Sequence, residues 1–204
     1  MTTETPLAPL CYLDAQSIAQ AVKAMIRPVC EEVTIAGSVR RAEAVCHDIE
    51  LVCVPRMTPR NGKPLFDDCD PELVSALDRF ANALSTTTGD LILDPITKRN
   101  GPRYKRFLAF GTVPVDLFIV RPPAEWGALL AIRTGPAEFS RLLVTKRRAG
   151  GAMPDDLDQR DGALWRGFQR IETPTEQSYF DAIGVPYLHP AQRSETRLIR
   201  LLPR

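Results

Sequence analysis

The sequence predicts an α/β (α+β) fold, in which a mixed β-sheet and helices form a larger unit and a small α/β lobe follows it. Three observations support this class. Apolar residues recur at helical spacing in some segments, they alternate at a period of two in others, and both kinds of segment follow one another along the chain. With 204 residues, 44% of them hydrophobic, the chain is also long enough to bury a core.

Residues 1–120 are expected to form the larger unit. Its predicted elements are a helix over 14–27, a strand over 33–36, a helical turn over 37–41, a strand over 48–54, a helix over 71–84, and strands over 91–98, 104–110 and 113–120. Asp14 is expected to cap the first helix, and Pro71 to begin the second one. On that second helix, Leu73 and Leu77 are expected to share the buried face.

Residues 121–204 are expected to form the smaller lobe, because Pro122-Pro123 interrupts the chain after the last of these strands. The predicted elements are helices over 125–133 and 137–148, turns and short strands over 150–172, a helix over 174–183, and a helix or strand over 194–202. Thr173 is expected to cap the helix over 174–183, and Gly184 to end it.

The charge, cysteine content and hydropathy of the chain argue against several classes of protein. The net charge is only +1, so a nucleic-acid site would have to be local. The five cysteines contain no C-x-x-C pair, which argues against a disulfide framework or a zinc ribbon and favours free thiols. Neither a signal peptide nor a membrane-spanning apolar stretch is evident, so we expect a soluble, intracellular protein of the cytoplasm or nucleoid.

Three acidic residues are candidate metal ligands. Asp48 and Glu50 stand two residues apart in a predicted strand, so their side chains point to the same face. Asp116 interrupts the apolar run of residues 113–120, where a charge is costly to bury unless it is paired or metal-bound. Magnesium prefers such oxygen ligands, and two ions would activate an attacking hydroxyl and stabilise a leaving oxygen. The alternatives are a solvated face for the pair and a buried ion pair with an arginine for Asp116.

A Gly-Ser turn precedes these acids and is a candidate phosphate site. Gly37 has no Cβ, so the N–H groups of the turn are open to a ligand, and a helical turn after Gly37-Ser38 would favour an anion. Arg40 and Arg41 follow at once and could grip a phosphate bidentately. Because Gly-Ser turns are common, this one is informative only together with the acids.

The order of these motifs resembles that of the family X DNA polymerases. The runs G-S-V-R-R at 37–41 and H-D-I-E at 47–50 are similar to the family's G-S-x-R-R and D-x-D signature. The run V-D-L at 115–117 resembles the strand that carries its third aspartate. The run T-G-P-A-E-F at 134–139 resembles its T-G-x-x-x-F motif, and residues 187–195 resemble its closing Y-x-x-P and R-x-E segment.

The resemblance implies a nucleotidyltransferase palm at residues 1–120 and a thumb-like nucleotide-selecting lobe at 121–204. Full-length relatives carry an N-terminal lyase domain, and because only 36 residues precede Gly37 here, we expect no deoxyribose-phosphate lyase activity. It implies a DNA-directed DNA polymerase of the beta type, which adds dNMP from dNTP to a DNA 3′-hydroxyl in short-gap repair. Asp48, Glu50 and Asp116 would be the catalytic, metal-binding residues, with two Mg²⁺ as cofactors and Mn²⁺ as a substitute. The nucleotide-binding residues would be Gly37, Ser38, Arg41, Ile132, Arg133, Thr134, Gly135 and Phe139.

Three positions depart from the family's pattern. Glu50 stands where the family has a second aspartate, and its longer arm predicts slower catalysis or a preference for manganese. Ile132 and Arg133 stand where the family often has two aromatic residues, which predicts weak discrimination against ribonucleotides. Pro136 stands after the glycine of an unusual cis peptide in the family, so we expect a cis bond before Pro136, a first helical position for it, or both.

The DNA contacts are expected to come from Lys105, Arg141, Lys146, Arg147, Arg148 and Arg193. Basic runs are usually solvated faces, but beside a polymerase-like site they are reasonable phosphate contacts, which would make binding steeply dependent on salt. We expect a monomer that binds primer or gapped duplex DNA and a dNTP, does not bind a membrane, and needs a protein partner for a firm grip on DNA.

Two other functions stay open from the sequence alone. The first is a template-independent or small-substrate nucleotidyltransferase on the same fold. The second is a non-catalytic nucleic-acid-binding protein with a decayed site, for which Glu50 is the only support. Primer extension with and without a template separates the three.

Overall fold

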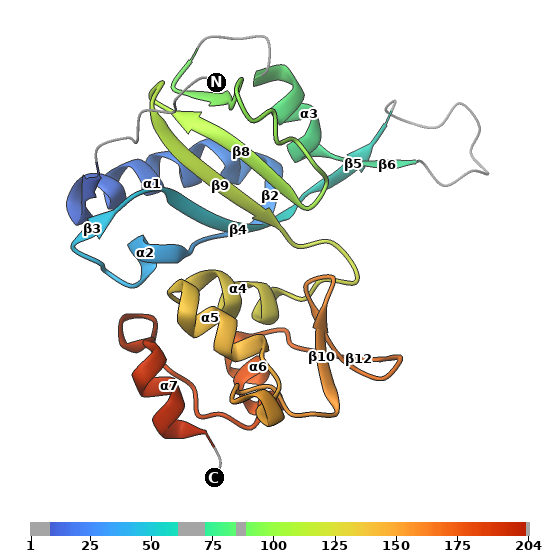
Figure 1. Cartoon of the computed structure of the whole chain (residues 1–204). Helices are drawn as coiled ribbons and strands as arrows, with labels where there is room; N and C mark the ends of the chain where they lie inside the picture. The colour runs from blue at the N-terminus through green and yellow to red at the C-terminus, as the bar shows by residue number, and fades with distance from the viewer. Residues whose placement is uncertain (1–8, 61–71, 85–88, 203–204) are drawn as a thin grey trace.

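The computed structural model describes residues 9–60, 72–84 and 89–202 of the chain. Figure 1 shows a sheet with its helices in the N-terminal part and a second body, rich in helices, beneath it. The described residues form a central sheet with the strand order β2-β4-β9-β8-β7. Its strands are β2 (Cys30–Ile35), β4 (Ile49–Pro55), β7 (Leu91–Leu93), β8 (Tyr104–Ala109) and β9 (Val113–Ile119).

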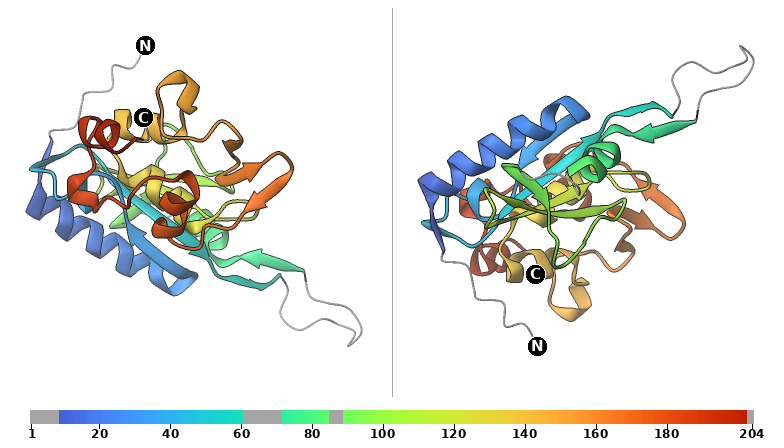
Figure 2. Two further views of the ribbon diagram at one scale, coloured as in Figure 1. Left: turned by 90° about the horizontal axis from the view of Figure 1, so that it is seen from below. Right: turned by 90° about the horizontal axis from the view of Figure 1, so that it is seen from above.

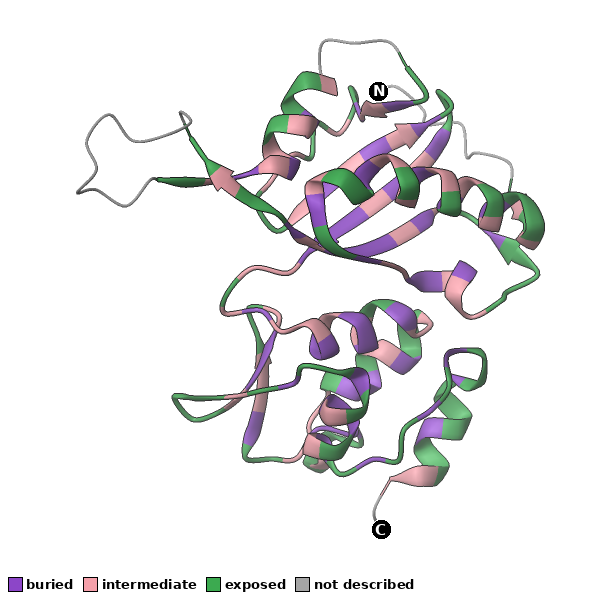
Figure 3. Ribbon diagram, turned by 180° about the vertical axis from the view of Figure 1, so that it is seen from behind, coloured by how far each residue is buried: buried purple, intermediate pink, exposed green. Residues whose placement is uncertain are grey.

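The sheet is mixed, as the sequence predicts. β4 and β9 run parallel, whereas the pairs β2–β4, β8–β9 and β7–β8 are antiparallel. Figure 3 shows how buried and partly buried residues alternate along these strands, because successive side chains point to opposite faces. One face packs against helices of the same unit and the other face is turned towards the C-terminal lobe.

Helices α1 (Tyr12–Ile26) and α3 (Ala76–Leu84) cover the first face and close the larger hydrophobic core. The core is lined from the sheet by residues such as Leu51 and Leu117, both about 1% exposed or less. α1 begins two residues before the predicted start, and its N-cap is Cys11. The predicted capping role of Asp14 is therefore wrong, because this residue lies in the first helical turn and accepts a hydrogen bond from the Cys11 thiol (3.1 Å).

Two small antiparallel pairs border the sheet. β1 (Leu10–Cys11) pairs with β3 (Val45–Cys46), and β5 (Met57–Pro59) pairs with β6 (Leu73–Ser75). The ribbon of β5 and β6 projects away from the body of the molecule (Figure 2). This pairing explains why the predicted helix over 71–84 begins only at Ala76, and why Leu73 is 53% exposed and not on a buried helical face. Pro71 lies outside the described residues.

The C-terminal lobe has a hydrophobic core of its own. Its elements are α4 (Trp126–Thr134), α5 (Ala137–Val144), β10 (Leu157–Arg160), β11 (Ala163–Arg166), β12 (Gln169–Ile171), α6 (Glu176–Ile183) and α7 (Glu195–Leu201). Short 3₁₀ turns lie at Arg27–Val29 in the larger unit and at Arg147–Ala149 and Pro190–Gln192 in this lobe. The segment that could have been a helix or a strand near the C-terminus is thus the helix α7.

Local chemistry sets the ends of these helices, and three predictions need correction. Thr175 caps α6 in place of Thr173, since its hydroxyl accepts the backbone N–H of Ser178 (3.1 Å). Gly184 ends that helix in the left-handed conformation, as predicted. The helix expected to reach residue 148 ends at Val144. Within the described residues the cis peptide joins Pro122 to Pro123, so the bond before Pro136 is trans.

The described cysteines, Cys11, Cys30, Cys46 and Cys53, are free thiols, as predicted; Cys69 lies outside the described residues. None of the helices in the described parts of the chain combines the length and the apolarity that a bilayer crossing requires.

Candidate active site

The three candidate ligands meet on the face of the sheet that is turned towards α4. β4 and β9 run parallel in a register that places Glu50 directly opposite Asp116. Asp48 lies in the bend just before β4, close enough for its charge to act on Glu50. All three residues are half-buried, so their charges interact through a medium that screens them less than bulk water does. The structure thus brings together the acids that the sequence singles out.

Burial and mutual repulsion make this group of acids electrostatically costly. Burial, with the neighbouring charges of Asp48 and Asp116, raises the pKa of Glu50 to about 7, against the opposing effect of Arg133. Burial also raises the pKa of Asp48, and the charge of Asp116 adds to that rise. Carboxylates that repel one another in a half-buried place are stabilised by a bound cation.

Glu50 lies against Gly37, and Asp116 has a hydrogen-bond and an ion-pair partner. The carboxylate of Glu50 lies over Gly37 so closely that a Cβ on this glycine would overlap its Oε2 atom. Oδ1 of Asp116 accepts a hydrogen bond from the Tyr104 hydroxyl (2.7 Å) and lies 3.5 Å from Nη1 of Arg106. The arginine pairing that the sequence leaves open for Asp116 is therefore present.

A metal ion would have to exchange these partners. Among the described residues, no group of three His, Cys, Asp or Glu side chains is already arranged to hold a metal ion. The donor set nevertheless suits a hard divalent cation, because Asp48, Glu50 and Asp116 offer only carboxylate oxygens and carry unfavourable like charges.

A cavity of about 590 Å³ opens beside Asp48 and Glu50. Ser38 and Arg41 line it from the larger unit, and the C-terminal lobe contributes Ile132, Arg133, Gly135, Pro136, Ala137 and Ser140. The Oγ atom of Ser38 is buried and has no hydrogen-bond partner. Because an unpaired buried hydroxyl costs free energy, a polar ligand that reached Ser38 would gain from this contact.

The two arginines of α2 (Gly37–Arg40) and its C-cap join the two lobes. Arg40 donates to the Thr134 hydroxyl (2.7 Å) and pairs with Glu176 (2.6 Å). Arg41 donates to the backbone carbonyl of Thr134 (2.9 Å) and pairs with Glu43 (3.2 Å). Arg41 still lines the cavity, but an anion would compete for a guanidinium that already has partners.

The residues of the T-G-x-x-x-F motif take different places around the cavity. Gly135 lines it, whereas Thr134 and Phe139 are fully buried and do not. A Cβ on Gly135 would overlap the Phe139 ring and lie 2.7 Å from Oγ of Ser140, so this glycine permits the close approach of α5. The nucleotide-binding roles of Thr134 and Phe139 stay predictions; both side chains are fully buried, and Phe139 packs in the core of the C-terminal lobe.

Two predicted DNA contacts are wrong because their side chains are buried. Lys105 is 2% exposed, and its ammonium group pairs with Asp78 (2.8 Å). The side chain of Arg193 is completely buried, pairs with Glu176 (2.8 Å) and donates to the backbone carbonyl of Leu188 (3.1 Å). Neither cation can reach a phosphate without breaking a buried ion pair, which is strongly unfavourable.

The other predicted DNA contacts differ in whether their charged groups are already held by acidic groups or carbonyls of the protein. Lys146 pairs with Asp158 (2.7 Å), and Arg147 donates to the carbonyl of Ile183 (2.5 Å) at the end of α6. Arg141 is exposed and pairs only across one helical turn, with Glu138. Arg148 is exposed and makes none of the ion pairs identified in the described part of the chain. Of the six residues, Arg141 and Arg148 are thus the best placed to meet a phosphate.

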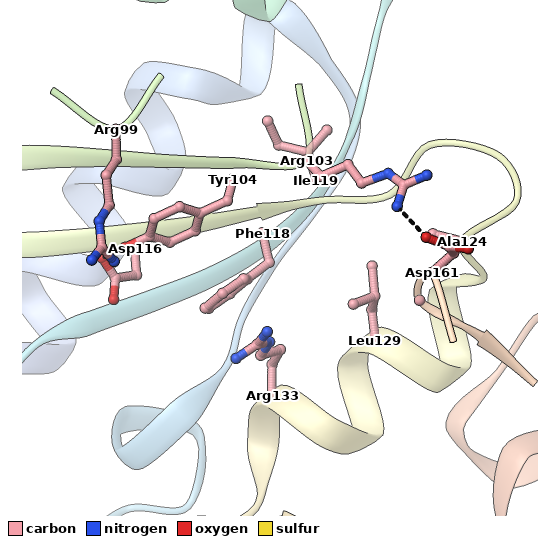
Figure 4. A pocket seen from close by; sticks show the side chains of 11 residues that line it. Arg99, Arg103, Tyr104, Asp116, Phe118, Ile119, Ala124, Leu129, Arg133 and Asp161 are labelled. Atoms are coloured by element: carbon pink, nitrogen blue, oxygen red, sulfur yellow. Dashed lines mark hydrogen bonds and ion pairs between the residues drawn. The ribbon is translucent and has the colours of Figure 1, made fainter. Parts of the chain in front are cut away.

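A second cavity, of about 480 Å³, lies on the other side of Asp116 and was not predicted. Figure 4 shows Tyr104, Phe118 and Arg133 around it, with Asp116 at one end. Tyr104 and Phe118 lie in predicted strands, but only the antiparallel register of β8 and β9 places them opposite each other. The sequence signal was weak, because aromatic residues are common in strands.

Comparisons with known proteins agree with this architecture. No family model matches the chain. DNA polymerase lambda of Rattus norvegicus is 23% identical over 175 residues, a match that covers 77% of this chain but only 28% of that relative. The solved structure of Leishmania infantum polymerase beta, a ternary P/T complex, superposes with a TM-score of 0.55 at 13% identity and covers 93% of this chain and 78% of that one. The chain therefore has a family X polymerase-like fold.

Proposed function

We propose that this chain is a nucleotidyltransferase, and more specifically a DNA polymerase of the beta type that transfers dNMP from dNTP to a DNA 3′-hydroxyl. The observation that carries the proposal is the position of Glu50 opposite Asp116, with Asp48 on the same side, beside a cavity that contains the unpaired Ser38 hydroxyl. The fold relationship to polymerases lambda and beta supports it.

The two cavities offer places for two substrates. Asp48 and Glu50 line the cavity with Ser38 and Arg41, whereas Asp116 lines the other cavity. Arg133 lines both. We assign the dNTP to the first cavity, where Ser38 and Arg41 would bind its phosphates. Its sugar would lie near Ile132 and Gly135, and since neither is aromatic, we expect weak rejection of ribonucleotides.

The three acids would hold two Mg²⁺, or Mn²⁺ in their place. Bound ions of this kind supply Lewis acidity to phosphoryl oxygens and make a hydroxyl easier to deprotonate. Asp116 would orient the attacking 3′-hydroxyl from the side of the second cavity, while Asp48 and Glu50 face the phosphates. Arg133 lines both cavities and would add positive charge between the two substrates.

The contact between Glu50 and Gly37 sharpens the expectation for this residue. The longer arm of glutamate brings its carboxylate over the glycine. The substitution Glu50→Asp would shorten the arm and should raise the single-turnover rate with magnesium several-fold, with a smaller change with manganese. An unchanged or lower magnesium rate would count against strain at Glu50.

Primer extension tests the proposed function directly. The labelled primer is supplied alone, on a template, and in a duplex with a one-nucleotide gap, with each dNTP or NTP and with magnesium or manganese. Incorporation that follows the template supports a beta-type polymerase. Incorporation that ignores the template supports a template-independent transferase, and no incorporation with either metal supports a non-catalytic nucleic-acid-binding protein.

The grip on DNA belongs to the same proposal. Arg141 and Arg148 would contact phosphates, so Arg141→Ala should reduce the slope of log affinity against log salt for duplex DNA by about 0.9. Arg166→Ala, on the hairpin of β10 and β11 and outside both cavities, is the matched control. We further propose a monomer that acts in short-gap repair and relies on a protein partner for firm DNA binding.

A further inference from the structure

The lining of the second cavity combines flat aromatic rings with positive charge. Tyr104 and Phe118 face each other across β8 and β9, with ring centroids 5.4 Å apart and ring planes inclined at 34°. The guanidinium of Arg133 lies over the Phe118 ring, 3.9 Å from its centroid. That of Arg99 lies 5.7 Å from the centre of the Tyr104 ring. Leu129 adds an apolar wall next to Phe118 (Figure 4).

A planar, apolar ligand with an attached anion fits this lining. The volume of the second cavity, about 480 Å³, lies in the range of small-ligand sites. Nucleobases stack on aromatic side chains and on arginine planes without regard to their sequence. The Arg103 side chain pairs with Asp161 (2.7 Å) and with no other acid of the described residues, and both side chains are about half exposed at 51% and 53%. Because such an exposed pair contributes little stability, Arg103 is free to exchange Asp161 for a phosphate.

We propose that this cavity binds the terminal nucleoside of the acceptor strand, with its base stacked among Tyr104, Phe118 and Arg133 and its phosphate near Arg99 and Arg103. The proposal rests on the proposed nucleotide transfer and adds the site of its second substrate. Asp116 lines the same cavity, so the 3′-hydroxyl of a base held there would lie beside this carboxylate.

The site has a consequence for the acceptor. The protein would hold the end of the strand through stacking with its own side chains, and not only through base pairing to a template. A single strand should therefore bind by its 3′ end. A strand that ends in a large base should bind more tightly than a strand whose 3′-terminal base is missing. The position of the missing base along the strand distinguishes this site from general attraction to phosphates.

The test measures binding of labelled oligothymidylates by fluorescence anisotropy, in EDTA and without dNTP. Three probes of equal length carry a 3′-terminal adenosine, a 3′-terminal abasic residue or a 5′-terminal abasic residue. We expect the adenosine-ended probe to bind about tenfold more tightly than the 3′-abasic one, because stacking of one base is worth roughly that factor. The 5′-abasic probe, which keeps its 3′ base, should bind several-fold more tightly than the 3′-abasic one.

Two variants assign the preference to this cavity. Arg133→Lys keeps the charge and removes the flat guanidinium, and Phe118→Leu keeps an apolar filler and removes the ring; each should reduce the preference to about threefold or less. Arg166→Lys, which changes an arginine outside both cavities, should leave it intact. A thermal melt followed by circular dichroism verifies that each variant is folded, and Arg133 is exposed enough to be replaced without loss of core packing.

Equal binding of the three probes by the unmodified protein would overturn the proposal, as would a preference that survives in both Arg133→Lys and Phe118→Leu. Binding in EDTA is independent of catalysis, so the two proposals fail separately. A 3′-base preference without incorporation in the primer assay would retain the acceptor site and refute the transferase, and incorporation without the preference would do the reverse.

Discussion

The two faces of the central sheet are made from the same strands and have opposite properties. Ile49, Leu51 and Cys53 point to the face that α1 and α3 cover, and all three are completely buried. Asp48 and Glu50 alternate with them on the side that α4 approaches. There the charge of Asp48 raises the pKa of Glu50, so two ionised carboxylates are unfavourable together. Burial of apolar surface stabilises a fold by about 25 cal/mol per Å², whereas close carboxylates destabilise it.

In β4 and β9, alternate residues serve different purposes: one set packs in the core, and the other set places carboxylates on the opposite face. The covered face provides the free energy of folding. The other face holds carboxylates that repel one another, and it can do so because the covered face keeps the strands in register. Neighbouring residues of one strand, such as Asp116 and Leu117, should therefore respond to substitution in different ways.

The largest effect is expected for Asp116→Asn on catalysis. Loss of one ligand charge beside the attacking hydroxyl should lower the single-turnover rate by roughly a thousandfold, which is about 4 kcal/mol in the activation barrier. The melting temperature should change little, because the lost repulsion with Asp48 and Glu50 offsets the lost ion pair with Arg106. Asp156→Asn, at an exposed ion pair with Arg166, is the matched control and should keep its rate. Retained activity in Asp116→Asn would remove this residue from the site.

Leu117→Ala probes the covered face one residue further on. Leu117 is 1% exposed and packs in the core between the sheet and the helices. Its truncation should lower the free energy of unfolding by about 2–5 kcal/mol, measured by urea denaturation. Ile199→Ala, at a residue of α7 that is 51% exposed, should lower it by much less. Equal losses in the two variants would contradict the assignment of Leu117 to the core.

Glu50→Gln should raise the free energy of unfolding when no metal is bound, whereas Leu117→Ala lowers it. The pKa of Glu50 is raised to about 7 in the folded state, above its ordinary value of 4.5, by burial and by Asp48. The folded state therefore binds more protons than the unfolded state between these values, and the free energy of unfolding falls as the pH rises from about 4.5 to about 7.

The glutamine variant lacks this loss, so at pH 8 in EDTA it should be more stable than the unmodified protein, by up to about 3 kcal/mol. The difference should vanish near pH 4, where Glu50 is protonated in both states. Urea midpoints at the two pH values measure it. Glu138→Gln, at an exposed helical pair, serves as the matched control. A stability gain of equal size at both pH values would contradict the electrostatic cause.

Gly37→Ala is expected to have the smallest effect on stability and a clear effect on the site. Gly37 has φ +60°, so alanine should cost about 1 kcal/mol of stability through the backbone alone. The new Cβ would also push the Glu50 carboxylate aside and lower the transfer rate. Gly111→Ala is the matched control, since Gly111 has φ +77° and open space around it. A similar loss of stability in both variants, with loss of rate only in Gly37→Ala, is the expected outcome.

Local patterns along the chain predicted much of the frame. The period-two alternation over 48–54 separates Ile49 and Leu51 from Asp48 and Glu50, and this separation does not depend on any distant contact. A charge in the apolar run over 113–120 likewise marks Asp116 as a residue that needs a partner. The end of α6 at Gly184 follows from local backbone conformation, and it was predicted for the same reason.

Distant contacts decided the rest. α3 begins later than predicted because residues 73–75 pair with β5, and a pairing over this distance has no signature in a single helical pattern. Lys105 and Arg193 look like surface cations in the sequence. In the folded protein both side chains are buried, and they pair with Asp78 and Glu176. Long basic side chains can be buried or exposed, and only their partners settle which.

The sequence by itself singled out the candidate metal ligands and predicted on which side of their strands they lie, because strand periodicity is a property of the backbone. The tertiary structure decided that Glu50 stands opposite Asp116 and that Tyr104 faces Phe118. Strand order and register depend on the summed packing of residues far apart in the chain, so no local pattern contains them. The second cavity exists only because of that register, and the acceptor site proposed for it became visible only in the folded protein.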